Sequence, residues 1–372
     1  MAVRNEAIES KEFNYKTVYS NQLVIQSENY EARHNLETNH KLQSEKNKHQ
    51  AVVYKIKGNK LLGIQGGYVV YNKNEILIES CNHEEIYFWR YFSKVRLFFQ
   101  IKRSTRKKRE HLFLLEHQLD FNFWHLHAEL IPQIAVILRS YFESNKDVRL
   151  TVITGQHFSE KYVGMLKLIF QDKIEIERNR GICYSAEYFY LTSTLYKREV
   201  RNNQKLQFRN FAFWSALNRF SELNLPIESN SSKQDVLLIS RQNAGSRRII
   251  NESELVDHLI NYGLSVKVIH LEEISWIEQL NCFKSVSSIV APHGAHSANL
   301  LYAAPKVRYV ELVSFERKRG VFPIIEQTDI CLNRRIDHII LDVGPAQNLH
   351  EDYMITGNVL KRLIFLLKYY AK

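Results

Sequence analysis

The sequence predicts an α/β protein with two domains. Its length of 372 residues is about 2.5 times the roughly 150 residues of an average domain, which favours two hydrophobic cores. Hydrophobic residues make up 45% of the chain and charged residues 24%, close to the averages of globular proteins. In both halves, short apolar runs of strand type alternate with longer segments of helical periodicity. This alternation is typical of parallel sheets that are covered by helices.

The first half begins with a polar segment, residues 1–50, which we expect to be a mobile arm or irregular cover. An N-terminal α/β domain is expected over residues 51–225. Its predicted strands are 51–57, 68–72, 75–80, 148–154 and 173–177, and its predicted helices are 83–101, 121–142 and 158–170. A basic run at 102–109 contains six cations.

The second half follows a linker-like stretch, 224–234, which combines Pro, Ser and Asn. We expect a doubly wound domain over 235–355 and a basic amphipathic helix over 356–372. The predicted strands are 235–240, 265–270, 287–292 and 307–313, and the predicted helices are 251–263, 275–284 and 296–304. Asn251 is the predicted N-cap of the first of these helices, with Glu254 as its capping partner. Such domains bind ligands at the carboxyl ends of their strands.

The formal net charge of +11 favours polyanionic partners: nucleic acid, anionic lipid or phosphorylated small molecules. No apolar run approaches the roughly 18 residues of a membrane-spanning helix, and the chain starts without an apolar signal segment. We therefore expect a cytoplasmic protein.

Several common motifs are absent from the sequence. It contains no G-x-x-x-x-G-K-S/T, no G-x-G-x-x-G and no G-x-S-x-G, which argues against P-loop, classical dinucleotide-binding and α/β-hydrolase proteins. Its four cysteines form no C-x-x-C pair, and there is no Asp-x-Asp triplet to hold a metal on a diphosphate. We expect no metal and no cofactor, so any diphosphate chemistry must depend on cations and backbone amides.

Residues 287–313 combine a buried strand, a turn of small residues, a short helix and a second strand. The backbone N–H groups of Gly294 and Ala295 stand at the start of the helix, where unpaired donors and the helix dipole favour an anion such as phosphate. Glu311 follows near the end of the second strand, where a carboxylate can accept hydrogen bonds from a ribose. The alternative is an ordinary βαβ turn with a surface glutamate.

Three arginines stand on one loop at a predicted strand end. Arg241 ends the strand, and Arg247 and Arg248 come just before the next helix. Guanidinium groups in this position suit a phosphate clamp. The alternative is a solvated run of charges.

Several segments in this order resemble the catalytic region of glycosyltransferase family 61: ISR, SRRIINESEL, ISWIEQL and VAPHGAHSANLLYAAPKVRYVELV. In that family an Arg-containing strand end, an R-x-I-x-N-E helix start, an S-x-x-E-Q helix, a G-A-x-x-x-N turn and a V-E-L strand recur. The match covers about 235–313, and FNFWHLHAELIP at 121–132 resembles the family's N-Y-x-H-W-x-x-E-x-x-P stretch. Two positions depart from that pattern: Leu126 replaces an aromatic residue, and Gln133 replaces a basic one.

The resemblance implies a GT-B architecture, in which two Rossmann-like domains face a cleft and the closing helix crosses back to the first domain. It implies an inverting, metal-independent transfer, with the acceptor in the first domain and the nucleotide-sugar donor in the second. The residues that would line the donor are Arg241, Arg247, Arg248, His293, Gly294, Ala295, Asn299 and Glu311. For the closing helix, surface binding to anionic lipid is the alternative.

Inverting transfer needs a base that removes the proton of the acceptor hydroxyl. His125 and Glu129 are four residues apart, so on a helix they share a face, and the resemblance places that stretch at the cleft. Either they are the base and its orienting partner, with the roles open, or they are a capping and packing pair. His127 points away from that face and is interpreted as structural.

The sequence thus predicts a hexosyl- or pentosyl-transferase that acts on a saccharide or lipid-linked saccharide, in the biosynthesis of capsule or another surface polysaccharide. We expect peripheral contact with an anionic membrane at its inner face, and no nucleic-acid partner. Two alternatives remain. One is a nucleic-acid-binding protein that uses the basic run 102–109. The other is a non-catalytic nucleotide-sugar-binding protein.

Overall fold

The structure, a computed structural model, describes residues 21–25, 51–57, 60–64, 67–72, 75–76, 108–115, 122–142, 147–155, 158–178, 183–192, 196–201, 204–209, 211–226, 234–313, 336–343 and 352–369. The described strands up to Thr192 belong to one compact unit, and the elements from Tyr196 onward belong to a second. The stretch expected as a linker, 224–234, thus falls inside the span of the second unit. The helix expected at 83–101 lies outside the described residues.

The first unit is built on a mixed sheet of nine strands. They are β1 (Asn21–Ile25), β2 (Ala51–Lys57), β3 (Lys60–Ile64), β4 (Gly67–Asn72), β5 (Glu75–Ile76), β6 (Lys108–Leu115), β7 (Leu150–Thr154), β8 (Ile174–Arg178) and β9 (Cys183–Thr192). The order is β5-β4-β3-β9-β6-β7-β8, and β2 pairs with both β1 and β9.

The prediction of a parallel sheet is correct only for part of this unit. The pairs β6–β7, β7–β8 and β6–β9 are parallel, whereas every pair that involves β1 to β5 is antiparallel. The reason lies in the connections: two residues join β3 to β4, and parallel strands need a crossover of a dozen residues or more. The expectation of an irregular arm is also wrong for Asn21–Ile25, which pairs with β2.

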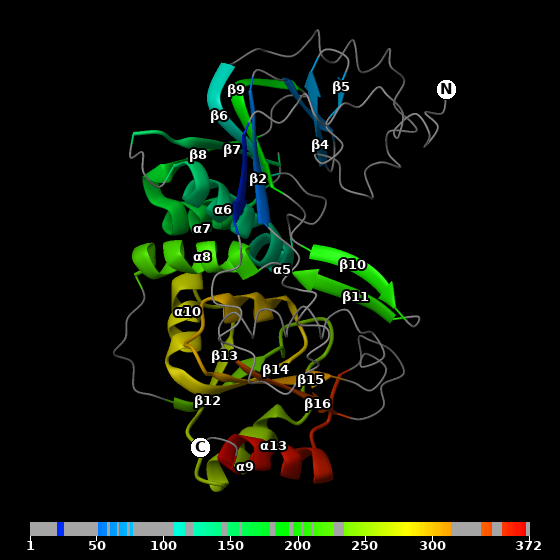
Figure 1. Cartoon of the computed structure of the whole chain (residues 1–372). Coiled ribbons are helices and arrows are strands. Elements are labelled where there is room, and N and C mark those ends of the chain that lie inside the picture. The colour runs from blue at the N-terminus through cyan, green and yellow to red at the C-terminus, as the bar shows by residue number, and fades with distance from the viewer. Residues whose placement is uncertain are drawn as a thin grey trace. The chain divides into compact units, whose positions relative to one another are not determined.

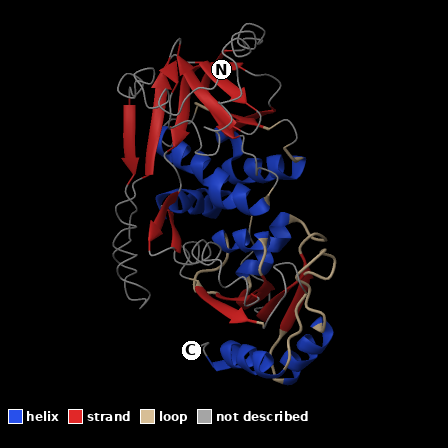
Figure 2. Cartoon of the chain, turned by 90° about the vertical axis from the view of Figure 1, so that its right-hand side faces the viewer, coloured by secondary structure: helices blue, strands red, loops and turns tan. Residues whose placement is uncertain are grey.

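The predicted helix 121–142 is confirmed as one helical stretch with a change of winding. It consists of α5 (Phe123–His125), a π-helical segment η4 (Leu126–Leu130) and α6 (Ile131–Tyr141). Asn122 caps it, since its side chain accepts from the N–H of Trp124 at 2.9 Å. The helix α7 (Glu160–Phe170) and the short 3-10 helix η5 (Gln171–Lys173) follow β7. Figure 2 shows helices lying along one side of this sheet.

The second unit contains the doubly wound domain that the sequence predicts. After the hairpin β10 (Tyr196–Arg201) and β11 (Gln204–Arg209) and the helix α8 (Phe211–Asn224) come five parallel strands: β12 (Gln234–Ser240), β13 (Val266–His270), β14 (Val286–Pro292), β15 (Arg308–Val313) and β16 (Asp337–Asp342). Their order is β13-β12-β14-β15-β16. The chain adds β13 on one side of β12 and then β14, β15 and β16 on the other side. The topological switch point therefore lies between β12 and β14.

Helices cover both faces of this sheet, as its nearly continuous apolar strands require. Figure 1 shows α9 (Glu252–Asn261) and α13 (Gly357–Tyr369) on one side and α10 (Trp276–Lys284) on the other. The 3-10 helix η6 (Ala295–Leu301) packs near α10. The core under α9 and α13 includes Val236, Leu238, Val290, Val310, Leu312, Leu255 and Leu259.

The closing helix α13 packs on its own unit. Leu363, Ile364 and Leu367 are buried in the core described above, and the Arg308 Nη1 donates to the carbonyl of Leu366 at 2.6 Å. The expectation that this helix crosses back to the first domain is therefore wrong for its described residues, because its apolar stripe is buried against β-strands of the second unit. Within the described ranges, no helix combines the length and apolarity needed to cross a bilayer.

The prediction for Asn251 is correct in its position and in its contact with Glu254, whose Oε2 lies 3.5 Å from the Asn251 Nδ2, but it is wrong about the capping hydrogen bond. Asn251 occupies the N-cap position, but its side chain makes no capping hydrogen bond and instead exchanges two 3.0 Å hydrogen bonds with the backbone of Ile355. A capping box does form at α10, where the Ser275 Oγ accepts from the N–H of Glu278 and the Glu278 carboxylate accepts from the N–H of Ser275. Asn251 thus joins α9 to the segment that leads into α13.

Candidate active site

The loops that follow β12 and β14 meet at the switch point of the second unit, where doubly wound proteins bind ligands. Two arginines, two histidines and a glycine that allows close backbone approach come together there: Arg241, Arg247, His293, His296 and Gly294. All but His296 were predicted as donor-lining residues. The group draws on two separate loops, because the contact between Arg247 and His293 joins positions 46 residues apart in the chain.

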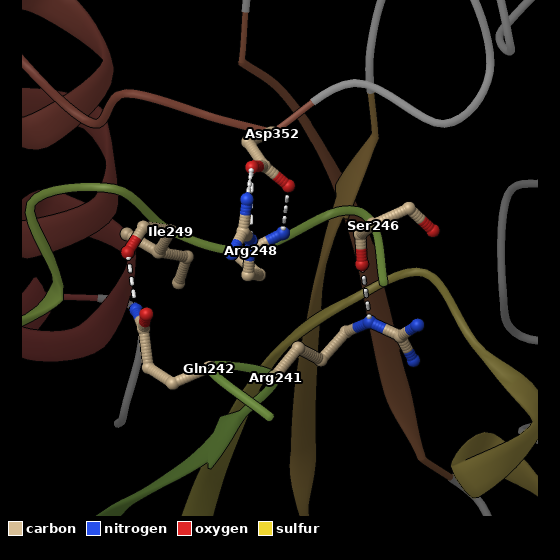
Figure 3. A network of polar contacts seen from close by, with 6 residues as sticks. All are labelled: Arg241, Gln242, Ser246, Arg248, Ile249 and Asp352. Carbon is tan, nitrogen blue, oxygen red and sulfur yellow. Dashed lines mark hydrogen bonds and ion pairs between the residues drawn. The ribbon is translucent and has the colours of Figure 1, made fainter. Parts of the chain in front are cut away.

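Arg241 is held by its own loop. Its Nε donates to the carbonyl of Ser246 at 3.2 Å, and the neighbouring Gln242 donates from Nε2 to the carbonyl of Ile249 at 2.6 Å (Figure 3). Burial lowers the pKa of Arg241, and the nearby Arg247 cation lowers it further. The two positive charges repel each other. A bound anion would therefore stabilise the charged form of both guanidinium groups.

Arg247 adopts a left-handed backbone conformation with φ of 60°, which is uncommon for a residue with a side chain. Its Nη1 donates to the carbonyl of His293 at 2.6 Å, so the loop after β12 is fastened to the end of β14. Among the described residues, its buried Nε has no hydrogen-bond partner.

The structure holds Arg248 away from the other two arginines. Its Nε and Nη2 donate to the Asp352 carboxylate at 2.9 and 2.6 Å, and its backbone N–H donates to the same group at 2.9 Å. Figure 3 shows this side chain turned toward Asp352, on the segment before α13, whereas Arg241 lies beside Ser246. Two of the three predicted clamp arginines are thus brought together.

At Gly294 the backbone lies very close to the side chains of His296 and Arg241. A Cβ atom at this position would lie 2.8 Å from His296 Nδ1 and 3.0 Å from Arg241 Nη1. Its φ of −177° is extended, so the space around it, and not its backbone conformation, requires glycine. Ala295 follows as the first residue of η6.

His296 was missed by sequence reasoning, although it stands in the same H-G-A-H turn. The residue is 8% exposed, and its Nε2 has no hydrogen-bond partner within the described part of the chain. Burial lowers the pKa of His296 to about 3, with a further contribution from the Arg241 cation. It is therefore a neutral imidazole between cationic neighbours at pH 7.

Glu311 lies between two histidines. The His293 Nδ1 is hydrogen-bonded to one of its carboxylate oxygens, and the His338 Nε2 to the other at 2.9 Å. Burial alone would raise the pKa of Glu311, but these two hydrogen bonds outweigh it and lower the pKa to about 2. At 1% exposure, Glu311 stands behind His293, which does not fit the direct ribose contact expected from the sequence. Nothing in the sequence pointed to His338.

Asn299 is fully buried and serves as a brace. Its Nδ2 donates to the Gln279 Oε1 at 3.0 Å, and its Oδ1 accepts from the Trp276 Nε1 at 3.3 Å. Gln279 in turn donates to the carbonyl of Leu271 at 2.7 Å. Asn299 was predicted to line the donor, whereas the structure places it where α10 meets η6. The S-x-x-E-Q pattern already contained its partner Gln279.

In the first unit, the predicted pairing of His125 with Glu129 is present. The His125 Nδ1 lies 2.7 Å from the Glu129 Oε2, and the side chains are 26% and 10% exposed. The π-helical segment begins directly after His125, and such segments are frequent at functional sites. His127 is fully buried against Phe123, and burial lowers its pKa to about 3, with the Lys161 cation adding to the effect. This agrees with the structural interpretation of His127.

The two positions that depart from the family pattern have packing roles. Leu126 is buried in the core of the first unit. Gln133 donates to the carbonyl of Glu129 at 3.1 Å and accepts from the Thr192 Oγ1 at 3.0 Å, which ties this helix to β9.

One group of described residues has the composition of a metal site. Donor atoms of His270, the last residue of β13, and of Glu272 and Glu273, just after it, lie within 4.8 Å of one another. Glu273 already accepts from the Asn243 Nδ2 at 2.9 Å, on the loop after β12.

The basic run 102–109 is described only from Lys108 onward, where β6 begins. Arg109 forms a two-point ion pair with Glu177 of β8, with its Nε 2.6 Å from the Glu177 Oε1. The charge of Arg109 is therefore neutralised by a carboxylate of the same sheet.

The comparison with known protein families agrees with the motifs. No curated protein sequence matches the chain. One solved structure that it resembles is that of the bacterial iron-containing dodecameric glycosyltransferase TibC from enterotoxigenic E. coli H10407, at 12% identity and a TM-score of 0.32, with 71% of this chain and 75% of that chain covered. Residues 123–310, half of the chain, match the family described as Glycosyltransferase 61, and this range includes both the His125–Glu129 pair and the switch-point cluster. The chain therefore belongs to glycosyltransferase family 61.

Proposed function

We propose that this glycosyltransferase is an inverting, metal-independent enzyme of GT-B type that moves a hexosyl or pentosyl group from a nucleotide sugar to a saccharide acceptor. One observation carries the proposal: two guanidinium groups, of Arg241 and Arg247, converge on the His293–Gly294 backbone at the switch point. Fixed cations around a glycine that admits close approach suit the diphosphate of a nucleotide sugar. There they stabilise the negative charge that develops on the leaving group.

A screen for donor hydrolysis and binding across common nucleotide sugars tests this proposal. Arg241→Lys and Arg247→Lys should each weaken nucleotide binding by about tenfold, because an ammonium cannot reproduce a bidentate guanidinium contact. Arg248→Lys is the matched control on the same loop, since Arg248 is paired with Asp352, and it should bind like the wild type. A folded protein that neither binds nor hydrolyses any donor would refute the proposal.

We assign the acceptor base to the His125–Glu129 pair of the first unit. The 2.7 Å contact gives either residue an orienting partner, and the partial exposure of His125 leaves it accessible to an acceptor hydroxyl. The acceptor would be a saccharide or lipid-linked saccharide of a surface polysaccharide.

We place the enzyme in the cytoplasm, in peripheral contact with the inner membrane face. The net charge of +11 and the three exposed cations of α13, Lys361, Arg362 and Lys368, support attraction to anionic lipid. In a sedimentation assay with vesicles that contain phosphatidylglycerol, the protein should be found in the vesicle pellet at low salt and in the supernatant at high salt. Absence of binding at low salt would contradict this placement.

A further inference from the structure

Glu311 lies in β15 and His338 in the adjacent β16, and His293 directly follows β14, so the three residues form a line toward the carboxyl edge of the sheet. Ala291 of β14 and Ile340 of β16 are the register partners of Glu311. His293 therefore stands two residues beyond Glu311 toward the edge, and His338 stands two residues before it, so all three side chains fall on one face of the sheet.

The charge of Glu311 determines which protons its partners carry. With its pKa held at about 2, the carboxylate is ionised at neutral pH and can only accept hydrogen bonds. Both contacts must then be donated, by the Nδ1–H of His293 and by the Nε2–H of His338. In a neutral His293 ring the other nitrogen, Nε2, is consequently a hydrogen-bond acceptor.

Both histidines are fixed from more than one side. The carbonyl of His293 accepts from the Arg247 Nη1 at 2.6 Å, and the next residue, Gly294, lies against Arg241. The ring of His338 stacks on Tyr309, with 5.3 Å between centroids and an interplanar angle of 28°. His293 is thus held at the edge of the arginine cluster, while Glu311 and His338 lie deeper in the sheet.

We infer that Glu311 and His338 are positioning residues that hold His293 in its Nδ1–H form, so that the His293 Nε2 accepts a hydrogen bond from a hydroxyl group of the donor's ribose or sugar. The inference rests on the proposed donor site. Its ligand chemistry follows from the tautomer: an unprotonated nitrogen accepts from a hydroxyl, whereas an ionised phosphate has no proton to donate. The two arginines then bind the phosphates, and the histidine line recognises a hydroxyl.

The decisive measurement compares nucleotides with inorganic pyrophosphate, which carries no hydroxyl group. Titration calorimetry with UDP, GDP, CDP and pyrophosphate should show that Glu311→Gln weakens the preferred nucleotide by about tenfold and leaves pyrophosphate within about twofold. Arg241→Lys should weaken both ligands. Equal losses for both ligands in Glu311→Gln, or no loss for either, would overturn the inference. Failure of the wild type to bind any of these ligands would overturn the proposed donor site, and the inference with it.

A pair of variants at His338 separates positioning from packing. Glutamine can present an amide N–H in place of the His338 Nε2–H, whereas leucine cannot. His338→Gln should therefore retain nucleotide affinity, and His338→Leu should lose it by about the same factor as Glu311→Gln. Equal affinity in the two variants would count against the inference.

The ring tautomers give a readout that a purely structural role would not change. Selective ¹⁵N and ¹³C labelling of histidine, with His293→Asn and His338→Gln spectra for assignment, should show the Nδ1–H form at His293 and the Nε2–H form at His338. In Glu311→Gln we expect the His293 ring to switch to the Nε2–H form, because the new amide nitrogen donates to its Nδ1 while the amide oxygen still accepts from His338. An Nε2–H form of His293 in the wild type would overturn the inference.

Discussion

The side chain of Asn299 donates a 3.0 Å hydrogen bond to Gln279, and both residues are buried. Gln279 belongs to the S-x-x-E-Q segment of α10, and Asn299 to the G-A-x-x-x-N turn that opens η6. Two motifs that are 20 residues apart in the chain therefore meet as one contact. The contact fixes η6, and with it Gly294 at the start of the turn, relative to α10 and the sheet.

The hydrogen bond between Asn299 and Gln279 should contribute to the free energy of unfolding. Asn299→Ala should lower the free energy of unfolding by about 1 to 3 kcal/mol, because the buried Gln279 Oε1 loses its donor. Urea denaturation of both single variants and of the Asn299→Ala/Gln279→Ala pair measures the effect. The two changes should be coupled by about 0.5 to 3 kcal/mol. Strictly additive losses would show that the hydrogen bond contributes nothing.

Gly294→Ala should weaken nucleotide binding by about tenfold with little effect on backbone strain. The added Cβ would lie 2.8 Å from His296 Nδ1 and 3.0 Å from Arg241 Nη1, so the imidazole and the guanidinium must shift. Gly245→Ala is the control on the preceding loop, since its Cβ meets nothing within 4 Å. Calorimetric affinities that are alike in the two variants would contradict the close approach at Gly294.

Turnover should persist in excess chelator. We expect leaving-group charge to be stabilised by Arg241 and Arg247, so removal of divalent cations leaves the chemistry intact. Donor turnover with and without EDTA tests this. If activity is lost and manganese restores it, the group His270, Glu272 and Glu273 is the first place to examine, and Glu272→Gln should then abolish the rescue.

Replacing the base should reduce turnover by about 10² to 10⁴ without a change in nucleotide affinity. His125→Ala and Glu129→Gln are the informative substitutions, since each removes one side of the 2.7 Å contact. His127→Gln is a control in the same helical segment, because that buried ring is assigned a structural role. Near-full turnover in both informative variants, with a verified donor and acceptor, would move the base elsewhere.

The protein should lose stability as the pH falls from about 6.5 toward 3. His127 in the first unit and His296 in the second each have a pKa of about 3 when folded, against 6.5 for an ordinary histidine. Between these values the unfolded chain binds protons that the folded chain does not, so unfolding becomes easier by about 1.4 kcal/mol per pH unit for each group.

Urea midpoints at pH 7.5, 6.0 and 5.0 measure this loss of stability. His296→Gln should flatten the dependence for the second unit, and His127→Gln should flatten it for the first. Midpoints that do not change between pH 7.5 and 5.0 would show that these imidazoles are not held neutral by burial.

Much of the second unit was predictable from local sequence. Its alternation of apolar strands and amphipathic helices, such as 235–240 followed by 251–263, reflects interactions within a few residues, and the structure has these elements at nearly the same bounds. The facing of His125 and Glu129 was predictable for the same reason, since helical geometry alone brings residues four positions apart together.

The directions of the loop arginines were decided only by the tertiary structure. Arg247 and Arg248 are adjacent and chemically alike, yet Arg247 turns to His293 and Arg248 to Asp352, which is 104 residues away in the sequence. The positive φ of Arg247 and the position of Asp352 set this choice, and neither can be derived from a local pattern.

The sequence by itself determined the family, the order of strands and helices in the second unit, and the loops at which functional groups gather. The tertiary structure alone decided that Glu311 lies behind His293, that Asn299 braces η6 and that α13 packs on its own unit. The physical reason is the distance along the chain over which each kind of interaction acts. Periodicity and turn chemistry act within a few residues, whereas the burial and hydrogen-bond partners of a polar side chain depend on segments that only the folded chain brings together.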